Sequence, residues 1–222
     1  MTSIGYNMSK LVSIMDALVE HWRLVEQEEG VPFVLQDGTT RDVALQLRNE
    51  AAAAMTAIVA PENEREGLQY SLQVARRAVL DKATRFRAAV RYLFPNTPYA
   101  RSLPRGEGPT ASTAKLFLMG EATAALWQII DDAGTPFVVD GETQGDFAGH
   151  VANLMAVWTQ LSEPRIAESL ARQDRRTKSL RLVALIKLYR QAIPVHFGPN
   201  SVFARSLPRL SRPSRSRRKT TD

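Results

Sequence analysis

The sequence predicts an all-α protein built from two tandem, pseudo-symmetric three-helix repeats that form a six-helix bundle. Apolar residues recur at steps of three and four along most of the chain, which is the helical period. Gly30-Val31-Pro32-Phe33-Val34 returns as Gly134-Thr135-Pro136-Phe137-Val138, and Ala100–Arg105 reappears unchanged as Ala204–Arg209. Both recurrences have the same spacing, which indicates a tandem duplication of a unit about half the chain long.

The first helix of the first repeat is predicted over residues 9–29, because its apolar residues line one face. Gly30 can end this helix, since glycine tolerates positive φ, and the proline that follows prevents continuation. The segment Pro32–Leu35 has the composition of a strand. Thr39 and Asp42 then have the spacing of a capping box, which marks the start of a second helix.

The second helix is expected to run to about Ala60. Its inward residues are predicted to be Val43, Leu47, Ala51, Ala54, Met55 and Ile58. A long third helix follows over residues 62–93, with Pro61 in its first turn. Pro95 stops it and begins an extended segment that reaches Arg105.

The second repeat follows the same plan after a glycine- and proline-containing linker at residues 106–112. Helices are predicted over residues 112–133, 144–161 and 164–193, with Pro194 ending the last of them. Thr143 and Asp146 supply the matching capping box. The predicted boundaries are therefore repeat 1 at residues 1–105, repeat 2 at 106–209 and a basic disordered tail at 210–222.

The two repeats cannot pack identically, because aligned positions differ in size. Val43 aligns with Phe147, and Ala54 aligns with Trp158. Each repeat also carries one extended segment whose backbone groups need partners. We therefore expect a minimal two-stranded contact between Pro32–Leu35 and Pro136–Val139.

The composition favours a reducing compartment. The chain has 222 residues, 44% of them hydrophobic, and no cysteine, so disulfides and thiolate metal sites are excluded. No signal peptide is predicted, because the N-terminus lacks a basic start followed by an apolar run. No transmembrane helix is predicted, because no stretch approaches ~18 consecutive apolar residues. The expected location is the cytoplasm.

The positive charge is concentrated at the C-terminus. The net charge is +6, and the seven basic residues from Arg205 onward, set against one acid, account for all of it. The candidate nucleic-acid-binding residues are Arg212, Arg215, Arg217, Arg218 and Lys219. They would contact phosphates without reading sequence, because the segment has no aromatic residue for base stacking. An anionic membrane surface and a simply solvated terminus are the alternatives.

No catalytic, cofactor-binding or metal-binding residue is predicted. The three histidines, His21, His150 and His196, have no metal-ligand spacing, and His21 is interpreted as a helix-surface residue. No phosphate-binding glycine loop and no nucleophile-elbow motif is present.

Three further patterns allow both a structural and a functional interpretation. The repeated Ala-Arg-Ser-Leu-Pro-Arg peptide either closes its bundle after the long helix or docks a partner. The acids that end each repeat's first helix, such as Glu26 and Asp131, could pair with Arg101 or Arg205, bind a metal or stay solvated. The basic cluster at residues 172–178 is either a solvated or kinked stretch of helix or an anion-binding patch.

These observations together favour a non-enzymatic structural or protein-interaction bundle, with a protein partner or self-association. The alternative is a nucleic-acid-associated accessory protein that acts through its basic tail. A ligand-binding or enzymatic bundle with a pocket between the repeats is a third hypothesis.

Overall fold

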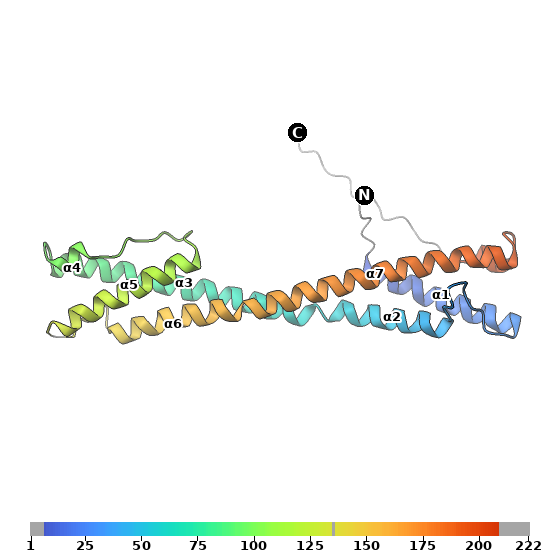
Figure 1. The fold of residues 1–222 in the computed structure, drawn as a ribbon, viewed down its shortest axis with the longest axis horizontal. Helices are drawn as coiled ribbons and strands as arrows, with labels where there is room; N and C mark the ends of the chain where they lie inside the picture. Colours follow the sequence, from blue (N-terminus) through green and yellow to red (C-terminus); the bar gives the residue numbers. More distant parts are fainter. Residues whose placement is uncertain (1–6, 135, 209–222) are drawn as a thin grey trace, which may run out of the picture. The chain divides into compact units, whose positions relative to one another are not determined.

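The computed structural model describes residues 7–134 and 136–208, and all regular secondary structure in them is helical. The helices are α1 (Met8–Glu29), α2 (Arg41–Thr56), α3 (Val59–Leu93), α4 (Pro98–Arg101), α5 (Thr113–Asp132), α6 (Gln144–Gln160), α7 (Ser162–Phe197) and α8 (Val202–Ser206) (Figure 1). The predicted all-α class is confirmed.

The chain divides into two compact units. Unit 1 combines Met1–Ala60 with Glu168–Asp222, so its described helices are α1, α2, α8 and most of α7. Unit 2 is Pro61–Ala167 and contains α4, α5, α6 and nearly all of α3. In Figure 1 unit 1 is coloured blue to light blue and orange to red, and unit 2 runs from teal through green to yellow-orange.

The compact units differ from the predicted repeats 1–105 and 106–209. Unit 1 combines α1 and α2 of the first sequence repeat with α7 and α8 of the second. Unit 2 combines α5 and α6 of the second repeat with α3 and α4 of the first. The sequence repeats stay a prediction about how the chain arose.

The core of unit 1 lies between α1, α2 and α7, and Ala44 and Ala51 of α2 are fully buried in it. Leu11, Met15, Leu18, Trp22 and Val25 of α1 are fully buried at steps of three and four. Leu182, Ile186, Tyr189 and Ile193 of α7 are fully buried in the same cluster. Each such side chain contributes about 1.5–3 kcal/mol relative to exposure. Trp22 and Tyr189 pack with ring centroids 4.6 Å apart.

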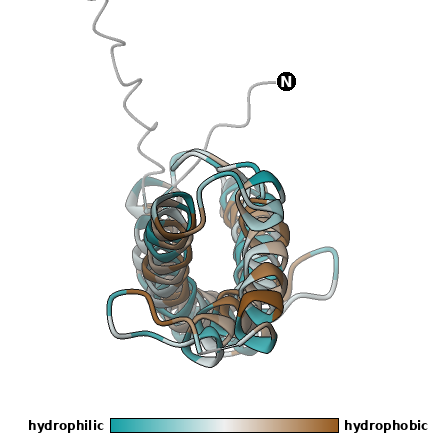
Figure 2. Ribbon diagram, turned by 90° about the vertical axis from the view of Figure 1, so that its left-hand side faces the viewer, coloured by the Kyte–Doolittle hydropathy of each residue, from teal (hydrophilic) through white to brown (hydrophobic). Residues whose placement is uncertain are grey.

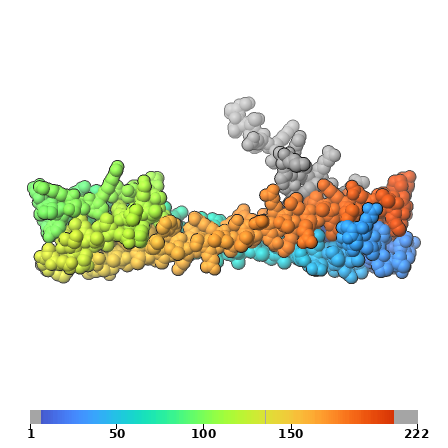
Figure 3. Space-filling model, in the orientation of Figure 1, coloured from blue at the N-terminus to red at the C-terminus, as the bar shows by residue number. Residues whose placement is uncertain are grey.

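The core of unit 2 repeats this arrangement with α3 and α5. Phe86 of α3 stacks on Trp127 of α5 with ring centroids 4.7 Å apart, and the centroid of Phe147 of α6 lies 5.8 Å from that of Trp127. Gly120 lets α5 and α6 approach closely, because a Cβ there would lie 2.8 Å from a Val151 methyl. The surfaces of α5 and α6 meet closely in the space-filling view (Figure 3).

Side-chain caps set most of the helix starts. Thr143 and Asp146 form the predicted capping box of α6. In unit 1 the cap of α2 is Thr40, whose hydroxyl accepts a hydrogen bond from the Val43 amide, so the prediction of Thr39 was wrong by one residue. Gly30 ends α1 at φ 68°, as predicted. Seen from the α4 end, hydrophobic and hydrophilic segments both occur along the helices, as amphipathic packing requires (Figure 2).

The shift of the cap changes which residues of α2 face inward. Val43 is 50% exposed, whereas Ala44 is fully buried. Counted from the two caps, Thr40 and Thr143, the partner of Phe147 is therefore Ala44 rather than Val43. A small residue in one core and a phenylalanine in the other occupy the same position after the cap.

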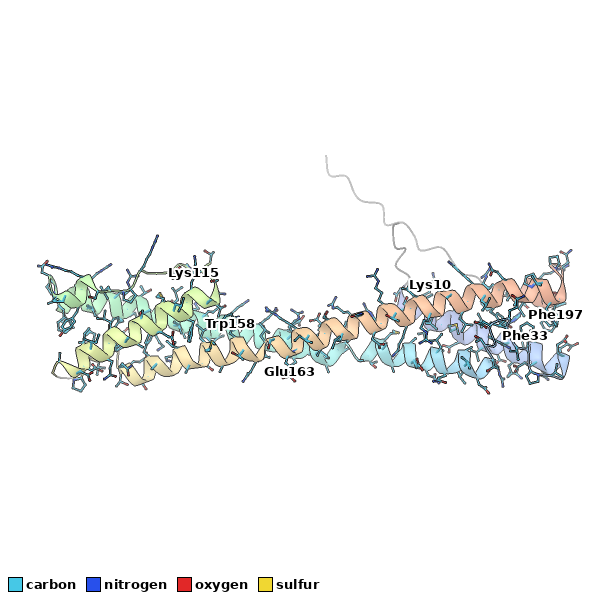
Figure 4. All side chains as sticks on the ribbon, in the orientation of Figure 1. Lys10, Phe33, Lys115, Trp158, Glu163 and Phe197 are labelled. Atoms are coloured by element: carbon cyan, nitrogen blue, oxygen red, sulfur yellow. The ribbon has the colours of Figure 1, made fainter. Side chains whose placement is uncertain are left out.

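α7 continues past the predicted stop. Pro194 lies inside the helix, which reaches Phe197. Proline removes one backbone donor, but the helix can bend without ending when packing holds its last turn. Phe197 provides that packing, because its ring centroid lies 6.0 Å from that of Phe33 and 5.0 Å from that of Phe203. Phe33 and Phe197 are close together in Figure 4.

The expected two-stranded contact is not shown. The described residues contain no strand, and their isolated bridge, Val139–Glu142, closes a turn within unit 2. The Leu35 amide donates to the Thr39 carbonyl, also locally. The extended segments therefore find hydrogen-bond partners close to them in sequence.

Candidate functional site

A tryptophan fixes the extended loop in each unit. Trp22 Nε1 donates a hydrogen bond to the Phe33 carbonyl at 2.9 Å, and Trp127 Nε1 donates to the Phe137 carbonyl at 2.6 Å. Both indoles are at most 1% exposed. Because the indole has no acceptor, its buried N–H needs such a carbonyl. Each loop is thereby held beside the long helix of its unit, and a groove lies between loop and helix.

The loop–α3 groove of unit 2 is a charged cavity of about 220 Å³. Its lining residues are Ala78, Asp81, Lys82, Arg85, Trp127, Val139, Asp140 and Glu142. Lys82 pairs with Glu142, and Arg85 Nη1 lies 2.6 Å from Asp140 Oδ2. Two ion pairs therefore connect the turn to α3.

α6 adds two ionisable groups next to these pairs. His150 Nε2 lies 3.7 Å from Glu142 Oε1. Burial and then the charge of Lys82 lower the pKa of His150, and Asp146 acts in the opposite direction. Hydrogen bonds from the backbone and side chain of Thr143 lower the pKa of Asp146.

Both cations that line the loop–α3 groove are paired. Lys82 faces Glu142, and Arg85 faces Asp140. Within residues 7–134 and 136–208, no group of three histidine or carboxylate side chains is placed to hold a metal ion.

The loop–α7 groove of unit 1 occupies the corresponding place and has a different lining. It measures about 330 Å³ and is lined by Phe33, Val34, Leu35, Gln36, Leu188, Gln191, Ala192, Val195 and His196. Val34 is 49% exposed and Val195 81% exposed. This groove is open and mostly apolar.

The difference between the grooves follows from two substitutions on the long helix. Phe86 and Tyr189 stack on equivalent tryptophans, so positions can be counted from them. The residues one and four places earlier are Arg85 and Lys82 in α3, but Leu188 and Leu185 in α7. The loop Phe33–Gln36 has no ionisable side chain, so no ion pair like those of the turn in unit 2 joins this loop to α7.

A second polar cluster lies within unit 1, around His21. The residue is 6% exposed, so its interpretation as a helix-surface residue was wrong. Its Nδ1 lies 2.8 Å from the Tyr189 hydroxyl, and its Nε2 lies 3.0 Å from the Phe203 carbonyl and 3.1 Å from Ser206 Oγ. The imidazole thus connects α1, α7 and α8.

The hydrogen bonds of His21 define its tautomer. The Phe203 carbonyl can only accept, so the proton sits on Nε2, and Nδ1 accepts from Tyr189. Burial raises the pKa of Tyr189, which keeps its hydroxyl a donor. A histidine that donates from Nε2 cannot take a proton from Ser206, whose hydroxyl can donate to the Val202 carbonyl at 2.9 Å. The cluster is therefore a structural link and not a Ser–His pair poised for catalysis.

The two copies of the repeated peptide pack against the cores. Leu103 and Tyr99 contact the unit 2 core, and Leu207 and Phe203 contact the unit 1 core. Arg190 of α7 also donates a hydrogen bond from Nη1 to the Pro208 carbonyl of the second copy. These contacts agree with the interpretation that each copy closes a bundle.

The acids at the helix ends have partners other than those predicted. Glu26 pairs with Arg41 at 3.0 Å, and Asp131 Oδ1 accepts from the Phe137 amide at 2.6 Å. Arg101 and Arg205 are exposed on α4 and α8. Glu26 thus pairs with the first residue of α2, and Asp131 binds a backbone amide of the loop that follows α5.

The remaining candidates fall into two groups. Arg212, Arg215, Arg217, Arg218 and Lys219 lie outside the described residues. The basic cluster at 172–178 lies on continuous helix, where Lys178 pairs with Asp174 at 2.9 Å. Most residues of this cluster are exposed, as the interpretation of a solvated stretch of helix expects.

Sequence reasoning missed His21 and Tyr189. They are 168 positions apart, so only the fold brings them together. The available signal was that His21 falls between Leu18 and Val25 on the apolar face of the first helix, next to Trp22. A histidine in that stripe is a candidate for a hydrogen-bonded core residue.

The chain was compared with known proteins in three ways. No protein-family model, no curated protein and no solved structure matches it. Among the helices of the described residues, none has the combined length and apolar character needed to cross a membrane.

Proposed function

We propose that the protein is a non-enzymatic interaction protein that binds a protein segment in the loop–α7 groove. One observation carries the proposal: two ion pairs cross the equivalent groove of unit 2, whereas the unit 1 groove has none and is lined mostly by apolar side chains. Its cytoplasmic location stays a prediction from composition.

The groove favours an extended segment that inserts an aliphatic or aromatic side chain. A cavity of about 330 Å³ with an apolar lining from Phe33, Leu188 and Ala192 accommodates such a side chain. The exposed amides of Gln36 and Gln191 at the groove can both donate and accept, which suits the backbone of an extended peptide. The segment belongs to another protein or to a second copy of this chain.

A charge placed in the groove tests the proposal. Val195→Lys is expected to reduce the amount of specifically bound protein recovered from a native lysate of the source organism by at least about tenfold, since burying an unpaired ammonium is costly. The matched control is Leu180→Lys, also on α7 and 61% exposed but outside the groove lining. Sedimentation velocity of both variants shows whether the bound segment belongs to a second copy. Equal recovery, or equal self-association, for wild type and Val195→Lys would contradict the proposal.

The basic C-terminus supports a second candidate, a nucleic-acid-associated role, because residues 205–222 carry the whole net charge of the chain. Arg212, Arg215, Arg217, Arg218 and Lys219 would contact phosphates. A gel-shift assay at several salt concentrations, with and without residues 210–222, tests it. Salt-dependent binding that disappears with the deletion is expected, and binding that is unchanged by the deletion counts against it.

We further propose that the two halves arose by tandem duplication. The repeated peptides, the paired caps Thr40 and Thr143, and the paired tryptophans Trp22 and Trp127 support this origin.

A further inference from the structure

Unit 1 holds its last described helix through a buried histidine, and unit 2 has a leucine at the corresponding position. α8 is five residues long, and a helix of that length is not stable by itself in water. It stays in place through Phe203, Leu207 and the hydrogen bonds to His21. In unit 2 the residue before Trp127 is Leu126, and the ring on the long helix is Phe86 rather than a tyrosine.

We propose that His21 is a pH-sensitive latch, whose protonation releases α8 from α1 and α7. In the neutral ring, Nε2–H donates a hydrogen bond to the Phe203 carbonyl, and Nδ1 accepts one from the Tyr189 hydroxyl. A second proton on Nδ1 would point at the hydroxyl that now donates to it. The bond would be lost, or the hydroxyl would have to turn and leave its own hydrogen without this acceptor.

The surroundings of His21 offer little compensation for a positive charge. α7 supplies Tyr189 and its neighbour Arg190, and α8 supplies Arg205, next to Ser206. The negative charge of Glu26 of α1 helps to raise the pKa of Tyr189. Arg41 of α2 pairs with this carboxylate at 3.0 Å. The groups that contact the ring itself are the Tyr189 hydroxyl, the Phe203 carbonyl and Ser206 Oγ, and none of these three is a carboxylate.

The direction of the pH dependence follows from this. Burial lowers the pKa of His21 below its ordinary value of 6.5, against the smaller opposite effect of the Phe203 carbonyl. The contribution of His21 to the docking of α8 is complete above about pH 6.5 and is lost as the pH falls below it. At about pH 5 the equilibrium constant for release of α8 rises by up to about 30-fold, the limit for a group that titrates near 6.5 when released.

A spin label on α8 measures the release directly. The chain has no cysteine, so Val202→Cys, on a residue that is 79% exposed, gives a single labelling site on α8. Arg101→Cys places the control label on α4, the corresponding short helix of unit 2. On acidification from about pH 8 to about pH 5, the mobile fraction of the α8 label is expected to rise severalfold, while that of the α4 label stays constant.

Two variants identify His21 as the cause. His21→Leu introduces the residue that unit 2 uses and should make the α8 label independent of pH. Tyr189→Phe removes the donor to Nδ1 and should move the transition to higher pH, which keeps the proposal testable if His21→Leu does not fold. His150→Gln controls for the second histidine of lowered pKa and should leave the transition unchanged. A pH-independent α8 label in the wild type, or a transition that persists in His21→Leu, would overturn the latch.

Discussion

At the residue scale, one interaction explains how each unit positions its loop. Near the C-terminal end of α1 and of α5, a buried tryptophan donates its indole N–H to a carbonyl of the loop that follows the helix. The rest of the ring fills the core, against Tyr189 in unit 1 and Phe86 in unit 2. The same side chain thus contributes apolar burial and satisfies a backbone group of the loop.

Replacing this indole by phenylalanine should destabilise either unit. Trp22→Phe and Trp127→Phe each lose the hydrogen bond to the loop carbonyl and part of the buried ring. We expect each to lower the free energy of unfolding by about 1–3 kcal/mol, measured by urea denaturation followed by circular dichroism.

The third tryptophan of the chain is the control for this experiment. Trp158 is 38% exposed, so Trp158→Phe should change the free energy of unfolding by no more than about 0.5 kcal/mol. If all three substitutions cost the same, the loop hydrogen bonds are not what distinguishes the two buried indoles.

At the element scale, local signals predicted most helices and misplaced some of their ends. Hydrophobic periodicity predicted α1, α2, α3, α5, α6 and α7, because the buried face of a helix places apolar residues at steps of three and four in the sequence. Pro194 was assigned as a stop because proline opposes helix continuation, but aromatic packing of Phe197 outweighs that local preference. Thr39 and Thr40 are adjacent threonines, and only the hydrogen bond to the Val43 amide distinguishes the cap.

The candidate sites were less predictable than the helices. The lining of each groove combines a loop with a long helix far from it in sequence, as Phe33 and Leu188 illustrate. Periodicity assigns residues to a helical face but does not say which other helix covers that face. The His21–Tyr189 link could not be predicted for the same reason.

At the scale of the whole molecule, charge is consistent with the way the long helices combine with the shorter ones. Residues 61–105, which contain most of α3, carry nine basic and four acidic side chains. Residues 106–167, which complete unit 2, carry two basic and eight acidic side chains. In unit 1, residues 1–60 are acidic and residues 168–208 are basic. A basic long helix thus joins an acidic helical pair in both units, and the Lys82–Glu142 and Arg85–Asp140 pairs form across that division.

The central claim is that each compact unit contains parts of both halves of the chain. Cleavage in the linker tests it most directly. A protease site inserted between Gly108 and Pro109, both exposed, would allow the folded protein to be cut into its two halves. Light scattering after size exclusion should then show one particle with the mass of the uncut chain, which separates into two fragments only in denaturant. Two independent folded species, each with about half that mass, would contradict the account, because each sequence repeat would then have packed on itself.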